Sequence, residues 1–164
     1  MNIFYLDKDP KTCAQYHCDT HCNKMILETA QLLSTAHRET GSPHAEFVYK
    51  STHKNHPSAI WARSSHDHYS WLFELFRELL NEFAYRRGKQ HASGRLLKWL
   101  SHNPPDLPTA GFTPPPQCMP DEYKCGNTVG AYRKYYVGDK AKFATWKWRR
   151  PSPNWYNSRV STTS

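Results

Sequence analysis

The sequence lacks any long hydrophobic run, and none of its apolar stretches approaches the roughly 18 consecutive residues that a membrane span needs. The first residues, MNIFYLDKDPK, also lack the basic-then-apolar order of a secretory signal. We therefore expect no membrane partner and a cytoplasmic location. Short CxxC motifs are absent and the five cysteines are an odd number, so free thiols or metal ligands are favoured over a disulfide framework.

Acidic residues are scarce relative to basic ones. There are 14 Asp and Glu against 22 Lys and Arg, a formal net charge of +8, and aromatic residues make up 14% of the chain. The charge is concentrated in residues 131–164, where eight basic residues accompany one acidic residue. Because basic side chains contact phosphates and aromatic rings stack on bases, the composition predicts a nucleic-acid partner, with double-stranded DNA as the first candidate. The alternative is a solvated basic tail.

Helical periodicity covers most of the chain. The expected helices span residues 10–37, 57–87, 94–101 and 127–146. Asp9 and Pro10 are a suitable cap and first-turn pair for the first helix, while Pro57 opens the second and Gly88 stops it. Residues 2–7 are expected to form a strand or an extended lead-in.

Seven prolines fall within residues 102–124, which must therefore form an extended surface connection. The length of 164 residues suits one domain, and neither internal repeats nor strand-rich segments are present. We expect a mainly α fold, a single compact helical domain over residues 1–160 with a basic aromatic C-terminal segment. Residues 161–164 are expected to be a disordered tail.

A polar stripe runs along the first predicted helix. Its members follow steps of three and four residues and so share one face: His17, His21, Lys24, Glu28, Gln31 and Thr35. The neighbouring face is mostly apolar and is expected to pack on the domain: Cys18, Cys22, Met25, Thr29, Leu32 and Ala36. A solvated face usually carries many Lys and Glu and few His, so a functional role for the stripe is favoured over simple solvation.

Lys24 is the candidate nucleophile of this stripe. Burial and neighbouring imidazolium groups both favour a neutral amine, which can attack a sugar C1′ or a carbonyl and form a Schiff base. Glu28, one turn further on, could hold the amine or move a proton. We therefore predict Lys24, Glu28, His21 and His17 as catalytic residues, against the alternative that Lys24 is an ordinary surface lysine.

The same segment also carries potential metal ligands. His17 with His21, and Cys18 with Cys22, are i,i+4 pairs of ligand types. The two pairs lie about 100° apart around a helix, so one ion would not readily take all four. We predict no cofactor and no resident metal, with a structural zinc ion as the alternative.

A second concentration of polar and aromatic residues, NHPSAIWARSSHDHYSWL, surrounds the start of the second predicted helix. Free N–H groups at a helix start can bind a phosphate. The predicted substrate-binding residues are His56, Asn55, Arg63, His66 and Tyr69, whereas Trp61 is expected in the core. The predicted phosphate-binding residues lie in the basic C-terminal segment: Arg133, Lys134, Lys147, Arg149 and Arg150.

The order of these blocks resembles the phage pyrimidine-dimer DNA glycosylase (endonuclease V-like) family, and uncharacterised phage proteins with similar NIFYLD and NHPSAIW blocks. The likeness lies in HCDTHCNKMILE, in the segment from NHPSAIW to EFAYRRGK, in YRKYY and in RRPSPNWY. It implies a small basic all-helical DNA-repair enzyme in the host cytoplasm, a hydrolase or lyase that flips a base and cleaves its glycosidic bond by amine attack. The C-terminal blocks would grip DNA, with Tyr135, Tyr136, Trp146 and Trp148 stacking on bases.

The sequence departs from this family in two places. The family uses its N-terminal amine after Met removal, but Asn2 is large enough that Met1 is expected to stay. Lys24 occupies the position of the family's acid, and Glu28 follows one turn later. Either Lys24 has taken over the amine role, or the scaffold performs another reaction such as DNA-base modification. The remaining alternatives are a non-catalytic, zinc-stabilised nucleic-acid-binding protein and an enzyme acting on free nucleotides.

Overall fold

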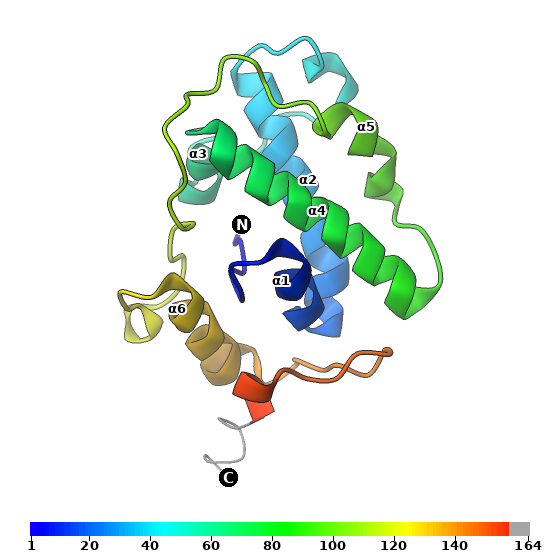
Figure 1. Ribbon diagram of the computed structural model, residues 1–164, viewed down its shortest axis with the longest axis vertical. Coiled ribbons are helices and arrows are strands. Elements are labelled where there is room, and N and C mark those ends of the chain that lie inside the picture. The colour runs from blue at the N-terminus through cyan, green and yellow to red at the C-terminus, as the bar shows by residue number, and fades with distance from the viewer. Residues whose placement is uncertain (158–164) are drawn as a thin grey trace.

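Two long helices, α2 (Asp19–Glu39) and α4 (His66–Arg87), cross at the centre of the structure (Figure 1). The computed structural model describes residues 1–157. The shorter helices are α1 (Pro10–Tyr16), α3 (Pro57–Ala62), α5 (Leu97–Leu100) and α6 (Thr128–Tyr135). Single 3₁₀ turns occur at η1 (Ala45–Phe47), η2 (Ala92–Leu96) and η3 (Asp121–Tyr123), and a π-helical turn at η4 (Tyr136–Lys140). Residues 1–157 contain no strand, so the predicted mainly α single domain is confirmed, while the predicted tail at 161–164 lies outside the described residues.

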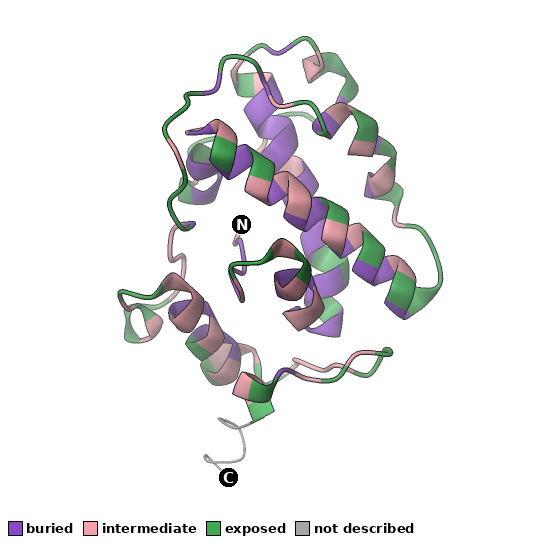
Figure 2. Ribbon diagram, in the orientation of Figure 1, coloured by how far each residue is buried: buried purple, intermediate pink, exposed green. Residues whose placement is uncertain are grey.

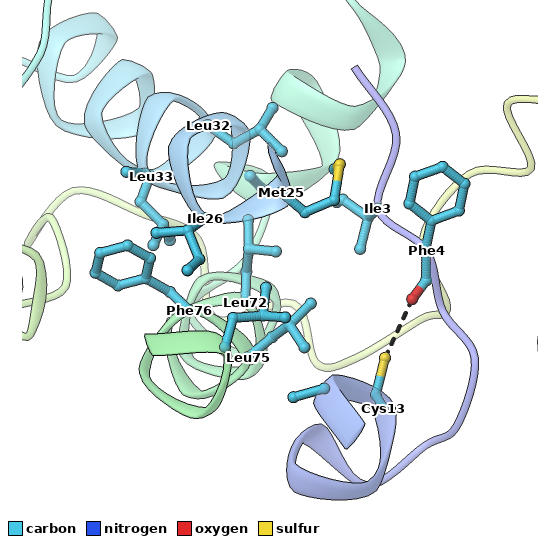
Figure 3. Close-up of a cluster of buried hydrophobic side chains, with 14 of the residues drawn as sticks. Ile3, Phe4, Cys13, Met25, Ile26, Leu32, Leu33, Leu72, Leu75 and Phe76 are labelled. Carbon is cyan, nitrogen blue, oxygen red and sulfur yellow. Dashed lines mark hydrogen bonds between the residues drawn. The ribbon is translucent and has the colours of Figure 1, made fainter. Parts of the chain in front are cut away.

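The core lies between α2 and α4. Figure 3 shows Ile26 and Leu33 of α2 facing Leu72 and Phe76 of α4, with Met25 directed toward Ile3. The predicted apolar face of α2 is buried, and buried residues line the inward sides of both helices (Figure 2). Packing of these two amphipathic helices fixes which faces remain at the surface.

The start and stop signals read from the sequence are confirmed. Asp9 accepts a 2.9 Å hydrogen bond from the Thr12 N–H, with Pro10 at the first position of α1. Pro57 opens α3 in the same way. Gly88 ends α4 in the left-handed conformation, at φ 69°.

The predicted helix over residues 10–37 is wrong in one respect, because it is interrupted at His17 and Cys18. Both residues have extended backbone, and the Cys18 N–H donates to the hydroxyl of Tyr136 instead of continuing the helix. A second interruption divides the predicted helix over 57–87 at residues 63–65, where the Ser65 side chain caps α4 by accepting from the Asp67 N–H. Both breaks are fixed partly by bonds to distant segments, which local periodicity does not reveal.

Two further predictions needed correction or refinement. The expected helix over 127–146 is shorter: α6 ends at Tyr135, and after the π-helical turn the chain is irregular up to a helical turn at residues 154–157. Residues 2–7 form neither strand nor helix, and the Leu6 N–H donates to the Phe4 carbonyl at 2.9 Å.

The proline-rich connection has no regular structure over residues 107–118, as predicted, whereas η3 interrupts its end at Asp121–Tyr123. The connection is hydrogen-bonded to the junction between α3 and α4. The Pro108 carbonyl accepts from the His66 N–H at 2.8 Å, and the Gly111 carbonyl accepts from the Ser65 hydroxyl at 2.6 Å. The Thr113 carbonyl accepts from the indole of Trp61, which is 7% exposed and belongs to the core as expected. None of the described helices is long and apolar enough to cross a membrane.

Candidate active site

Lys24 and Glu28 line a cavity of about 560 Å³ on the outer side of α2. Its other lining residues are Met1, Asn23, Leu27, Gln31, His53 and His91. Lys24 is exposed, so the burial that was expected to favour its neutral amine is not found, whereas Glu28 and Gln31 are half-buried. Three members of the predicted stripe therefore share one surface hollow, as their spacing on α2 requires.

His17 and His21, also predicted as catalytic, lie in the core and do not line this cavity. His17 is 1% exposed, and its Nδ1 lies 2.7 Å from the carbonyl oxygen of Cys13, so Nδ1 carries the proton and donates. Its Nε2 is buried and has no hydrogen-bond partner among residues 1–157. Burial lowers the pKa of His17 to about 4, so the ring is neutral near pH 7.

His21 is held between aromatic rings. It stacks on Phe4 with centroids 4.2 Å apart, and its Nδ1 lies 2.6 Å from the hydroxyl of Tyr136. Burial lowers the pKa of His21 to about 3. The break at residues 17–18 and the packing of the η4 turn place both imidazoles in the interior, where they support the fold of α2 rather than a surface reaction.

Two histidines that the sequence reasoning missed do line the cavity. His53 comes from the loop before α3, where its backbone is left-handed at φ 49°. His91 caps η2 through Nδ1, which accepts from the Ser93 N–H at 3.0 Å, and burial lowers its pKa. Neither residue belongs to a periodic pattern, so only the folding of the two loops against α2 brings them to Lys24 and Glu28.

The predicted substrate-binding cluster does not form one site. Tyr69 is fully buried, and its hydroxyl donates to the Leu100 carbonyl at 2.7 Å and lies 2.8 Å from Nε2 of His37. His56 uses Nδ1 to accept the Ser58 N–H and so caps α3 with its own side chain. Tyr69 therefore has no surface to offer a substrate, and the side chain of His56 occupies one of the free N–H groups that was expected to receive a phosphate.

The other members of that cluster are more accessible. Asn55 is exposed, and Arg63 is half-buried with a buried Nη1 that has no partner among residues 1–157. His66 is half-buried beside Asn103, whose side-chain nitrogen lies 3.4 Å from its Nδ1. None of these residues lines the cavity at Lys24.

The basic residues of the C-terminal segment divide into two groups. Arg133 donates to the Leu6 carbonyl and to Asp7, and Arg150 donates from two nitrogens to Glu82 at 2.8 and 3.0 Å, so both serve the fold. The exposed members of the predicted set are Lys134, Lys147 and Arg149, and Lys142, which was not predicted, is also exposed. Among the aromatic residues predicted to stack on bases, Tyr135 and Tyr136 are buried and Trp146 is half-buried, whereas Trp148 is 46% exposed.

The potential metal ligands remain apart. Within residues 1–157, no three His, Cys, Asp or Glu side chains come close enough together to hold a metal ion. All five cysteines are free thiols, and Cys13, Cys18 and Cys22 are buried, with the Cys13 thiol donating to the Phe4 carbonyl. The donor set needed for the zinc alternative is thus not assembled in this part of the chain.

Comparisons of the chain with protein-family models, with curated proteins and with solved structures found no match. The geometry of the cavity and of the surrounding surface is therefore the basis on which a function is proposed.

Proposed function

We propose that this protein is a DNA-acting enzyme that receives a flipped nucleotide in the cavity at Lys24 and cleaves its glycosidic bond with the Lys24 amine. The observation that carries the proposal is the placement of Lys24 and Glu28 one helical turn apart, lining the same cavity of about 560 Å³. A volume of this size lies within the ordinary range of small-ligand sites. The net charge of +8 supports a polyanionic substrate.

The chemistry follows from the two side chains. Nζ of Lys24 in its neutral form attacks C1′, the bond from C1′ to the base nitrogen breaks, and its electron pair leaves with the base. Glu28 accepts the proton that the attacking nitrogen loses, and the departing base takes a proton from water. Opening of the sugar ring, with protonation of O4′, then gives an iminium between C1′ and Nζ that water hydrolyses.

His53 and His91 complete the polar lining of the cavity. Neutral His91 uses Nδ1 as an acceptor, so its proton is on Nε2, which can donate to a base or a sugar oxygen. Gln31 can contribute both a donor and an acceptor from α2. These groups would position the substrate.

Borohydride trapping tests the proposal. The protein is incubated with duplex oligonucleotides that carry a pyrimidine dimer, an abasic site or a hydroxymethylated base, and the iminium is reduced to a stable adduct. We expect a covalent adduct with the wild-type protein and none with Lys24→Ala. Glu28→Gln should slow adduct formation by about 100-fold or more, the usual contribution of a general acid or base.

Lys11→Ala is the matched control, since Lys11 is an exposed lysine of α1 that does not line the cavity. It should be trapped as the wild-type protein is. An adduct that persists in Lys24→Ala would contradict the assignment of the nucleophile. Salt-sensitive DNA binding with no adduct on any substrate would favour the alternative of a non-catalytic nucleic-acid-binding protein.

A further inference from the structure

Two exposed aromatic rings lie beside three arginines at the C-terminal end of α4. Tyr85 is 40% exposed, and Cζ of Arg149 lies 4.2 Å from its ring centroid, with Cζ of Arg150 at 4.6 Å. Trp148 is 46% exposed, and Cζ of Arg87 lies 4.2 Å from its ring centroid. Tyr85, Arg87, Trp148 and Arg149 together are called the stacking platform below.

The segment that carries Trp148 and Arg149 is held firmly against the helices. Asp19, at the start of α2, accepts from the Lys147 N–H at 2.7 Å and from the Thr145 hydroxyl at 3.3 Å. On the other side of the platform, Arg150 is bonded to Glu82 of α4. Because Asp19 and Glu82 are each only 5% exposed, these anchors are shielded from water and fix the platform before any ligand arrives.

Arg149 adopts a backbone conformation that a residue with a side chain seldom takes, with φ 66°. In this conformation its Nη1 donates to the Tyr85 carbonyl at 3.1 Å. A strained backbone between two firm anchors is a feature found at binding sites. In this protein the backbone conformation of Arg149 places its guanidinium over the ring of Tyr85.

The charge of the platform is not neutralised locally. Within the part of the chain that the structure describes, neither Arg87 nor Arg149 forms a salt bridge with a carboxylate. Exposed rings offer a stacking surface for bases, and unpaired guanidinium groups pair with phosphates. An acidic peptide would pair with the guanidinium groups but would leave the aromatic rings without a stacking partner.

We infer that the stacking platform binds unpaired nucleotides of a nucleic-acid strand. The inference rests on the proposed function only in taking nucleic acid as the partner. It requires no chemistry at Lys24. In a duplex the base faces are already stacked, so the rings of the platform favour single-stranded or locally opened segments.

One edge of the cavity lies close to the platform. His91 of the cavity follows Arg87 of the platform by four residues, a separation of about 14 Å at most between their Cα atoms.

Fluorescence anisotropy with labelled oligothymidine, compared with a duplex of equal length at matched salt, tests the inference. We expect tighter binding of the single strand. Trp148→Ala should weaken that binding by about 5- to 100-fold, the loss typical of one stacked base. Trp148→Phe, which keeps a stacking ring, should restore most of it, and Arg87→Gln should weaken binding and reduce its salt dependence.

Phe47→Ala and Arg77→Gln are the matched controls. Phe47 is equally exposed, at 46%, but stacks on Trp99 away from the platform, and Arg77 is an exposed arginine paired with Glu74. Both controls should bind the single strand within about twofold of wild type. Equal affinity for duplex and single strand with no effect of Trp148→Ala would overturn the inference, as would equal competition by polyglutamate.

The same experiment separates this inference from the proposed function. Lys24→Ala should bind oligothymidine as wild type does, even though it loses the covalent adduct. Loss of the adduct with binding intact would concern only the cavity. Loss of single-strand binding in Trp148→Ala with an unchanged melting temperature would support the platform whether or not the cavity is catalytic.

Discussion

Arg86 of α4 donates from Nη1 to Asp19 of α2 at 3.1 Å, and their side chains are only 1% and 5% exposed. Arg86 also donates from Nε to Glu82 at 2.9 Å and from Nη2 to the Gln15 carbonyl at 3.0 Å. Arg150 covers the remaining side of Glu82. One buried cluster of charges thus joins the end of α1, the start of α2, the last turns of α4 and the C-terminal segment.

Asp19→Ala should destabilise the fold strongly. The substitution removes the Asp19 carboxylate that pairs with buried Arg86, so the cluster is left with one positive charge in excess. Breaking a buried ion pair in this way typically lowers the free energy of unfolding by about 3–5 kcal/mol. Urea denaturation measures this loss. The control is Glu74→Ala, which removes the partner of exposed Arg77 and should cost less than about 1 kcal/mol. Equal losses in the two variants would contradict the structural role of the cluster.

Three buried histidines should make stability depend on pH. Burial lowers the pKa of His17 and of His37 to about 4, and that of His21 to about 3. In the unfolded chain these rings have a pKa of about 6.5, so between about pH 4 and 6.5 the unfolded chain binds more protons than the folded one. Stability is therefore greatest above about pH 6.5 and falls as the pH decreases through this window.

Urea denaturation at pH 7.5 and 5.5 checks the sign and size of this effect. Each buried histidine should contribute a loss of about 1 kcal/mol on going to the lower pH. His21→Gln should lose one such contribution, so its stability should change less between the two pH values than that of wild type. A wild-type protein that is equally stable at both values would show that the imidazoles are accessible to protons in the folded state.

Much of the helical framework could be predicted because its signals are local. The cap at Asp9, the prolines at positions 10 and 57, and Gly88 act on their own turns, so the sequence alone places these boundaries. The spacing of Lys24 and Glu28 likewise places both on one face of α2, whatever the rest of the chain does. The cavity confirms that shared face, while their catalytic role stays a prediction.

The rest of the site depends on contacts between distant segments. His17 and His21 belong to the same sequence stripe as Lys24, but Tyr136 binds Cys18 and His21 across more than 100 positions of sequence and encloses that end of the stripe. His53 and His91 reach the cavity from two separate loops. A helical wheel of residues 17–35 contains none of these contacts, so it cannot tell the buried end of the stripe from the exposed end.

Gly88→Ala should cost about 1 kcal/mol, because an alanine at φ 69° is strained in the left-handed region. An added Cβ would meet no atom within 4 Å, so the loss reflects backbone conformation alone. Gly126→Ala is the control: its Cβ also meets nothing within 4 Å, and its φ is not positive. Thermal unfolding should show a lower melting temperature for the first variant and an equal or slightly higher one for the second.

Tyr136→Phe should destabilise the junction of α1, α2 and α6 without touching the cavity. The hydroxyl of Tyr136 accepts from the Cys18 N–H at 3.3 Å and lies 2.6 Å from Nδ1 of His21, so its removal leaves two buried polar groups without that partner. A loss of about 1–3 kcal/mol in the free energy of unfolding is expected from such unsatisfied groups.

The matched control is Tyr85→Phe, which changes an exposed tyrosine on α4 and should keep the free energy of unfolding within about 0.5 kcal/mol of wild type. Because neither Tyr136 nor His21 lines the cavity, Tyr136→Phe should retain borohydride trapping at temperatures where it is folded. Loss of trapping in a folded Tyr136→Phe protein would instead show that the buried imidazoles act on the substrate through α2.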